Sequence, residues 1–294
     1  MTQLQTPPMA PVVVHIGYSK TGTTTLQSHL FGRHPEIWSI GKPTVTPEGR
    51  RLLECLTRPN VDTNYVDANA AWWKRIPHTG RVTVLSHESL SQAAYYRSEF
   101  GMALPERIAR LFGQAKVMIG TRNQVAWLES YYLHHTRPSQ YKSFPDFIRQ
   151  DRTHDMNYHR VAMMYVAQFG LENVGIFPVE ELAGTPKDYM GRAAQFIGVT
   201  VRDFDLAPPR ANSRKSHRHI LYARMRSLIP LPAMRNPPRY LVKMAEAFLS
   251  GGRPSSTNIP DDLRHEIEHS AAASNAALSR EFGIDLKSLG YAVS

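Results

Sequence analysis

Several features that would assign a chain to a familiar class of protein are missing from these 294 residues. There is one cysteine, Cys55, so no disulfide can form within the chain, and no Cys/His spacing resembles a zinc site. We therefore expect no bound metal. The sequence shows neither a signal peptide nor an apolar run long enough to span a membrane. These absences predict a globular cytoplasmic protein.

Acidic residues are absent from one long stretch. Between Asp205 and Glu246 there is neither Asp nor Glu, whereas nine arginines and lysines fall there, so most of the formal net charge of +10 lies in this stretch. A local field of this sign attracts polyanions, an anionic membrane surface or an anionic cofactor. Apolar residues interleave with arginine over 218–250, which predicts peripheral contact with the inner face of a membrane. A solvated basic face without a partner is the alternative.

The rest of the chain alternates short apolar runs with segments of helical periodicity. Buried strands are predicted at 12–16, 81–88, 115–120 and 173–178. Helices are predicted at 23–33, 105–112, 124–135, 144–149, 158–169, 186–197 and 259–282, with irregular helix and loop at 34–77. This alternation indicates parallel βαβ units, so we expect an α/β, P-loop-like fold of three layers, with a central parallel sheet and helices on both faces. One domain is expected over 1–294, with 208–294 as an appended or lid-like part.

The chain is organised around the loop that follows its first predicted strand. This loop contains Lys20 between Gly17 and Gly22, and it leads into a helix that begins with three threonines at 23–25. A helix N-terminus presents backbone N–H groups and the positive end of the helix dipole, and the lysine and hydroxyl groups add further donors. The loop therefore predicts a site for a phosphate-like anion.

The same loop departs from the P-loop of nucleoside triphosphatases, G-x-x-x-x-G-K-[ST]. Gly17 and Gly22 have the right spacing, but Thr23 stands where the lysine is required, and the lysine lies inside the loop. The third predicted strand is followed by Thr121 and Arg122, where an acid that holds magnesium would be expected. A kinase or ATPase is therefore the weakest of the interpretations.

Two segments together resemble the cofactor signature of PAPS-dependent sulfotransferases, PAPS being 3′-phosphoadenosine 5′-phosphosulfate. The first is Lys-Thr-Gly-Thr-Thr-Thr-Leu-Gln at 20–27, and the second is the pair Arg122 and Ser130, eight residues apart after the third strand. The resemblance implies that the loop binds the 5′-phosphosulfate and that Arg122 and Ser130 bind the 3′-phosphate. It also implies in-line transfer of a sulfuryl group to an acceptor hydroxyl without a metal.

The resemblance further implies roles for individual residues. Lys20 is the expected catalytic cation at the bridging oxygen. Arg214 and Lys215 are the expected counterpart of a basic loop that closes over the 3′-phosphate. The residues expected to bind the 5′ end of the cofactor are Ser19, Lys20, Thr21, Gly22, Thr23, Thr24 and Thr25.

The general base is expected at the end of the second predicted strand, which reads Ser86-His87-Glu88. Members of the family use either a histidine or a glutamate here, and bacterial relatives commonly show Ser-x-Glu, which aligns Glu88 with the shared position. Adjacent strand residues point to opposite faces, so only one of the two is expected to face the acceptor. Glu88 is the first candidate and His87 the second, while Glu36 is a further acid that stays open.

Weaker similarity at 169–174, 180–182 and 274–286 resembles bacterial sulfotransferases that act on carbohydrate or small hydroxyl acceptors. This implies a carbohydrate or a lipid-linked glycan as acceptor, and no nucleic acid as partner. A competing interpretation is a non-catalytic protein that binds polyanions through the basic stretch and keeps the loop as a degenerate nucleotide fold. A steep dependence of binding on salt would distinguish such a protein.

Overall fold

The structure is a computed structural model that describes residues 11–76, 80–91, 99–135, 142–150, 156–202 and 259–294. The chain divides into two compact units. The first comprises Met1–Asn123, Thr153–Leu206 and Ala271–Ser294, and the second comprises Gln124–Arg152 and Ala207–Ser270. The expectation of one domain stays a prediction, and 208–258 of the expected lid-like part lies outside the described residues.

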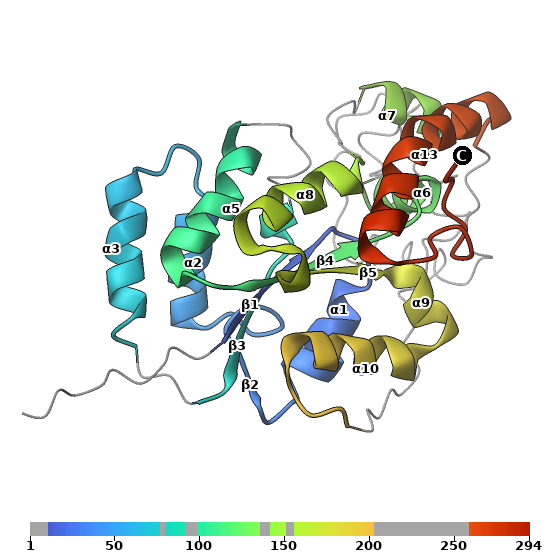
Figure 1. Ribbon diagram of the computed structural model, residues 1–294. Coiled ribbons are helices and arrows are strands. Elements are labelled where there is room, and N and C mark those ends of the chain that lie inside the picture. The colour runs from blue at the N-terminus through green and yellow to red at the C-terminus, as the bar shows by residue number, and fades with distance from the viewer. Residues whose placement is uncertain (1–10, 77–79, 92–98, 136–141, 151–155, 203–258) are drawn as a thin grey trace, which may run out of the picture. The chain divides into compact units, whose positions relative to one another are not determined.

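The first unit contains a sheet of five parallel strands in the order β2-β3-β1-β4-β5 (Figure 1). The strands are β1 Val12–Gly17, β2 Ile37–Ser39, β3 Val82–Ser86, β4 Lys116–Thr121 and β5 Val174–Pro178. All six residues of β1 are buried, as expected for a central strand covered on both faces. The predicted α/β fold with a parallel sheet flanked by helices is thereby confirmed.

Helices of the first unit cover both faces of the sheet (Figure 1). They are α1 Thr23–Thr25, which continues as a π-helix over Leu26–Phe31, then α2 Pro47–Thr57, α3 Thr63–Trp73, α5 Glu99–Phe112, α8 Tyr158–Phe169, α9 Val179–Gly184 and α10 Pro186–Ile197. One face packs on the π-helix and α10, through a cluster that includes Leu30, Met118 and Ile197. Helix α8 packs on strands β4 and β5 of the sheet, and α5 packs against α8.

The observed elements differ from the predicted ones in several places. The edge strand β2 was not predicted because three residues are too few to show a period of two. The segment expected to be irregular holds α2 and α3, whose N-caps Thr46 and Asp62 accept hydrogen bonds from the backbone N–H groups of Gly49 and Asn64. Helix α5 begins at Glu99 and contains Pro105, which the sequence pattern had placed at its start.

The second unit contains the predicted helices α6 Gln124–His135 and α7 Phe144–Gln150. They are joined by Tyr132, whose ring lies edge-on to Phe144 at 5.3 Å and whose hydroxyl donates to the Lys142 carbonyl at 2.9 Å. The long helix α13, Asp261–Phe282, begins in the second unit and belongs to the first from Ala271 onward.

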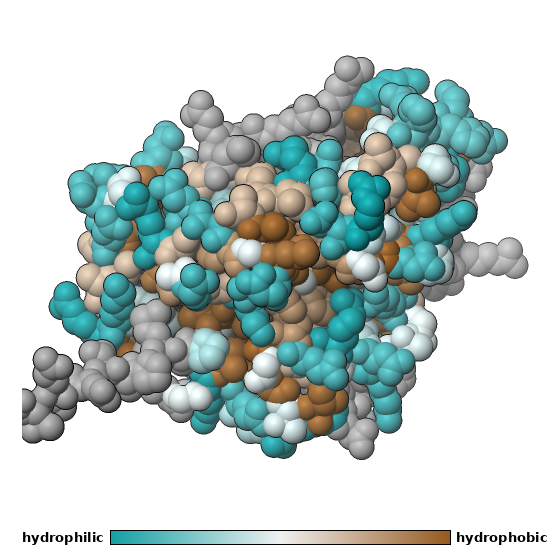
Figure 2. Space-filling view, in the orientation of Figure 1, coloured by the Kyte–Doolittle hydropathy of each residue, from teal (hydrophilic) through white to brown (hydrophobic). Residues whose placement is uncertain are grey.

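Hydrophilic residues are spread over much of the described surface in Figure 2. The large hydrophobic side chains that are exposed in the described ranges are Tyr65, Leu171 and Val201, which are far apart in the sequence. Among the helices that the structure describes, none combines the length and the apolar character needed to cross a membrane.

Candidate active site

The carboxyl ends of β1, β3 and β4 lie side by side because β1 pairs in parallel with both β3 and β4. Three segments therefore leave the same edge of the sheet: the first loop (18–22) after β1, residues 87–88 after β3, and the arginine turn (121–123) at the end of β4. Ligands of open parallel sheets bind at this edge. The fold thus brings the candidate residues of three distant segments together.

The first loop is held in a sharp turn by its own backbone. Lys20 and Gly22 both have positive φ angles, 70° and 75°. The buried Thr21 donates its hydroxyl hydrogen to the Tyr18 carbonyl at 2.6 Å, and its N–H donates to the same oxygen at 3.3 Å. Gly22 then caps the helix that begins at Thr23. The N–H of Thr25 already donates to the Gly22 carbonyl at 2.9 Å, but the N–H groups of Thr23 and Thr24 precede the first helical hydrogen bond, so they are available to an anion.

Two glycines allow the close contacts around this loop. A Cβ atom on Gly17 would lie 2.0 Å from the Cγ2 atom of Thr23, and one on Gly22 would lie 2.8 Å from the Cγ2 atom of Val179. Gly22 also has the left-handed conformation that side chains disfavour. Neither Gly17 nor Gly22 can therefore be replaced by a larger residue without a shift of its neighbours.

Lys20 and Arg122 place two cations close to each other at the sheet edge. The Arg122 Nη1 atom donates to the Lys20 carbonyl at 3.0 Å, which ties the arginine turn to the first loop. Burial of the half-buried Lys20 side chain, reinforced by the Arg122 charge, lowers the pKa of Lys20. Binding an anion between the two cations would relieve their mutual repulsion.

Glu88 points from β3 toward the first loop. Its Oε1 atom lies 3.4 Å from the Thr23 hydroxyl, and its Oε2 atom forms an ion pair with the Lys42 Nζ atom at 2.6 Å. Burial by itself would raise the pKa of Glu88, but the hydrogen bond and the charge of Lys42 outweigh burial, so the pKa is lowered. Glu88 is therefore a carboxylate at neutral pH, which is the form that accepts a proton.

The neighbouring His87 is turned onto its own chain. The His87 Nδ1 atom accepts the N–H of Ser89 at 3.1 Å and lies 2.7 Å from the Ser89 hydroxyl. Burial lowers the pKa of His87. Of the two candidate bases, only Glu88 has a described contact with Thr23, the residue that follows the first loop.

Lys42 is a site residue that the sequence did not reveal, because it lies in the segment that showed no clear periodicity. Its N–H donates to the Ser86 carbonyl at 2.9 Å, which fixes the backbone beside the end of β3. The preceding Gly41 lies so close that a Cβ atom there would approach the same carbonyl oxygen to 2.3 Å. The lysine that pairs with Glu88 is thus anchored at the end of β3, two residues before Glu88.

A buried polar network underlies the first loop. The His15 Nδ1 atom lies 2.8 Å from the Ser86 hydroxyl, to which the Gln27 side chain also donates at 3.0 Å. Burial lowers the pKa of His15 to about 4, against the opposing charge of Glu88. His15 is therefore neutral at pH 7. The signal that could have found it is a single polar residue inside the apolar run 12–16.

No protein-family model and no curated relative matches this sequence. Its fold, however, is similar to that of a solved sulfotransferase from Alicyclobacillus acidocaldarius, with a TM-score of 0.57 and 17% identity. The alignment covers 95% of this chain and 98% of that one. This chain has a sulfotransferase-like fold.

Two other solved sulfotransferases align with this chain at lower TM-scores. The sulfotransferase domain of the Synechococcus olefin synthase has a TM-score of 0.35 and 18% identity, covering 84% of this chain and 98% of that one. Mouse sulfotransferase SULT7A1, solved in complex with PAP, has a TM-score of 0.43 and 14% identity, covering 92% of this chain and 88% of that one.

The remaining expected site residues are Glu36, Ser130, Arg214 and Lys215. The carbonyl of Glu36 accepts from the N–H of Val82, the first residue of β3. Glu36 therefore lies at the amino ends of the strands, whereas the first loop lies at their carboxyl ends. Ser130 is on α6 in the second unit, and its convergence with Arg122 stays a prediction. Arg214 and Lys215 lie outside the described residues. Within the described part of the chain, no group of three or more metal-ligating side chains occurs.

Proposed function

We propose that the protein is a PAPS-dependent sulfotransferase that transfers a sulfuryl group to an acceptor hydroxyl. The observation that carries the proposal is the meeting of three chemically distinct groups at one sheet edge. Lys20 offers a cation in an anion-binding loop, Arg122 offers a guanidinium 3.0 Å from the carbonyl of that lysine, and Glu88 offers a carboxylate 3.4 Å from Thr23. These are the groups needed to hold a charged donor and to remove a proton.

The residues of the first loop fit a phosphosulfate group. Gly22 leaves no side chain in the way, Thr24 is exposed, and the start of the helix offers N–H donors. We assign Ser19, Lys20, Gly22, Thr23, Thr24 and Thr25 to binding the 5′ end, and Thr21 to shaping the loop through its bonds to Tyr18. Arg122 suits a 3′-phosphate because its planar fork can bind two oxygens at once.

The proposed chemistry divides between Lys20 and Glu88. PAPS, when bound, supplies the sulfuryl group and a nucleotide phosphate as leaving group. The Glu88 carboxylate, kept ionised by Lys42, takes the proton of the acceptor hydroxyl as the new O–S bond forms. The Lys20 ammonium stabilises the negative charge that develops on the oxygen that leaves with adenosine 3′,5′-bisphosphate (PAP). Each group thereby acts on an atom whose charge changes in the reaction.

The acceptor part of the proposal rests on the sequence resemblance. We propose a carbohydrate or lipid-linked glycan hydroxyl as acceptor, Arg214 and Lys215 as further contacts to the 3′-phosphate, and 218–250 as a peripheral membrane contact. A screen of acceptors with labelled PAPS tests this part, since a transferred label identifies the hydroxyl class directly.

Nucleotide binding tests the function without knowledge of the acceptor. PAPS or PAP without magnesium should raise the melting temperature at micromolar concentration, whereas ATP with magnesium should not. Lys20→Ala and Arg122→Ala should each remove this shift, and Lys74→Ala, which removes an exposed cation of the same first unit, should retain it.

The opposite pattern would support one of the competing functions. Stabilisation by ATP with magnesium but not by PAP would indicate a kinase-like enzyme. Binding of heparin with a steep salt dependence, unaffected by Lys20→Ala and without any shift by PAP, would indicate a non-catalytic polyanion-binding protein.

A further inference from the structure

Each residue of the arginine turn is fixed by a side chain from another part of the first unit. The Thr121 hydroxyl lies 3.3 Å from the Tyr291 hydroxyl. The Arg122 carbonyl accepts from the Tyr158 hydroxyl at 2.8 Å. The Asn123 N–H donates to the Glu180 Oε1 atom at 2.9 Å. The backbone that carries the Arg122 side chain is thereby held on both sides and in the middle.

Glu180 joins two of these contacts through its two carboxylate oxygens. While Oε1 accepts from Asn123, Oε2 accepts from the Tyr291 hydroxyl at 2.9 Å. Glu180 lies in the first turn of α9, where a carboxylate is also favoured by the helix dipole. Charge-assisted hydrogen bonds of this kind are stronger than bonds between neutral groups.

Tyr291 reaches the sheet edge from the terminal segment that follows α13. The tyrosine is 3% exposed, its N–H donates to the Leu286 carbonyl at 3.0 Å, and the neighbouring Gly290 carbonyl accepts from the Asn123 side chain at 2.6 Å. Burial, and then the charge of Glu180, raise the pKa of Tyr291 well above its usual value. The hydroxyl therefore stays protonated and can donate.

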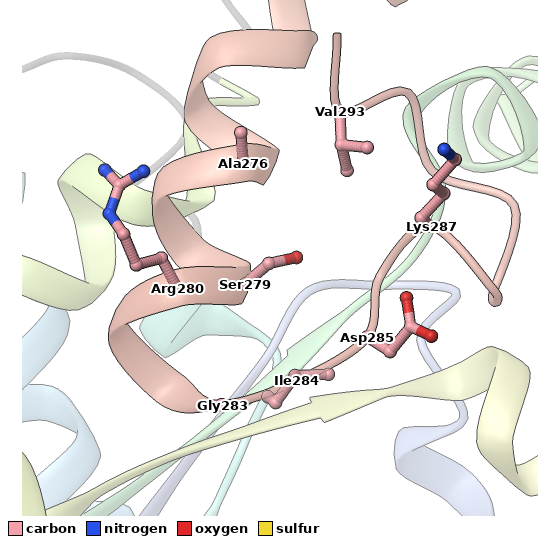
Figure 3. A pocket seen from close by; sticks show the side chains of 8 residues that line it. All are labelled: Ala276, Ser279, Arg280, Gly283, Ile284, Asp285, Lys287 and Val293. Atoms are coloured by element: carbon pink, nitrogen blue, oxygen red, sulfur yellow. The ribbon is translucent and has the colours of Figure 1, made fainter.

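Packing on α13 does not fully account for the position of this segment. A pocket of about 510 Å³ lies between the end of α13 and the terminal segment, with the Ser279 hydroxyl pointing into it from the helix and Val293 lining it from the segment (Figure 3). The Leu286 and Tyr291 side chains of the segment are buried, and the segment is also held by hydrogen bonds, which include the Asn275 bond to the Ala292 carbonyl at 2.8 Å and the Tyr291 bonds at the sheet edge.

We infer that Glu180 and Tyr291 are positioning residues that hold Arg122 for the 3′-phosphate, so that they set the preference for a nucleotide carrying that phosphate. The inference rests on the proposed function. A guanidinium on a fixed backbone loses less conformational freedom when it binds a phosphate, so the free-energy cost of binding is lower. This saving favours only nucleotides whose 3′-phosphate contacts the guanidinium. Loosening the turn should therefore weaken 3′-phosphorylated nucleotides selectively.

The test compares PAP with adenosine 5′-monophosphate, which differs from it only by lacking the 3′-phosphate. Dissociation constants are measured by calorimetry on the full chain. Tyr291→Phe removes a hydroxyl that contacts both Thr121 and Glu180, and it should weaken PAP by about tenfold or more, since two hydrogen bonds are lost, while changing adenosine 5′-monophosphate by less than about twofold. Thr121→Val removes only the contact with Tyr291 and should give a smaller selective loss of about three- to tenfold, the effect of one net hydrogen bond. Glu180→Gln, which alters both contacts of the carboxylate, should give a larger one.

Tyr189→Phe is the matched control, because Tyr189 is equally buried and its hydroxyl has no hydrogen-bond partner within the described residues. It should leave both affinities unchanged. An equal loss for both nucleotides in Tyr291→Phe or Thr121→Val, or an unchanged preference in either, would overturn the inference. Failure of the unaltered protein to bind PAP, or to prefer it to adenosine 5′-monophosphate, would instead overturn the proposed function.

Discussion

The first loop and the arginine turn sit next to each other at the sheet edge but are stabilised in opposite ways. The first loop takes its shape mainly from residues within it, through positive φ angles at Lys20 and Gly22 and the bonds of Thr21 to Tyr18, with one distant hydrogen bond from Arg122 to the Lys20 carbonyl. The arginine turn takes its shape from Tyr158, Glu180 and Tyr291, the last of which is 170 positions from Thr121. One half of the proposed cofactor site is therefore local in sequence, and the other is assembled by the fold.

This difference predicts that the two regions respond differently to mutation. A change inside the first loop should damage its conformation directly, because no distant contact can restore a left-handed backbone. A change to one distant support of the arginine turn should have a graded effect, because the remaining supports persist. The predictions below test this contrast from the largest expected effect to the smallest.

Glu88 provides the largest expected effect, because a general base acts on the chemical step itself. It belongs to neither of the two binding regions, so its loss should leave nucleotide binding intact. Glu88→Gln should lower turnover by about 10² to 10⁴, the usual contribution of a positioned base, while the melting shift caused by PAP is retained. Turnover with labelled PAPS and melting curves measure the two effects separately.

The control for Glu88→Gln is His87→Ala, which removes the second candidate base and its contacts to Ser89. We expect it to keep most of the turnover. If His87→Ala were inactive while Glu88→Gln remained active, the base would be His87 and the assignment of Glu88 would be wrong.

Gly22→Ala tests whether the first loop depends on its own backbone. A left-handed alanine is disfavoured by about 1–2 kcal/mol, and overpacking against Val179 should add about 1–3 kcal/mol to the loss of unfolding free energy. PAP binding should be lost as well. Denaturant unfolding and calorimetry measure the two consequences.

Gly113→Ala is the matched variant, because Gly113 also has a left-handed φ, 71°, but a Cβ atom there would meet nothing within 4 Å. It should show only the backbone strain and should bind PAP normally. Equal destabilisation of the two variants would mean that the contact with Val179 is not important.

His15 tests whether buried side chains also support the first loop. Its pKa is lowered from 6.5 to about 4 in the folded protein, so as the pH falls through this range the unfolded chain takes up a proton that the folded protein does not. The free energy of unfolding should therefore fall with decreasing pH, by at most about 1.4 kcal/mol per pH unit from this residue. His15→Gln should show a shallower decline in denaturant unfolding between these pH values, and an unchanged slope would contradict the burial argument.

The sequence was sufficient for the parts of the molecule whose signals are local. The apolar runs predicted β1, β3, β4 and β5, and the lysine and glycines after the first run predicted an anion site in the loop that follows, which stays a prediction. Arg122 was selected because it directly follows a strand and, with Ser130 eight residues later, resembles a family signature, and its role also stays a prediction. Each of these features is determined by a few neighbouring residues, so their order along the chain is enough to find them.

The supporting residues could not be predicted in this way. Lys42 lies in a segment without clear periodicity, and His15 is a single polar residue in an apolar strand. Glu180 is 57 positions from its partner Asn123, and Tyr291 is in a terminal segment whose return to the sheet edge has no local signal. Their roles follow from tertiary contacts, which composition and spacing do not encode.

The most direct test of the central claim is a crystal structure of the full chain with PAP. We predict the 5′-phosphate on the first loop, within hydrogen-bonding distance of the Lys20 side chain, and the 3′-phosphate on the Arg122 guanidinium. PAP bound only in the basic stretch 210–243, with the first loop and Arg122 free of ligand, would contradict the claim and favour a non-catalytic polyanion-binding protein.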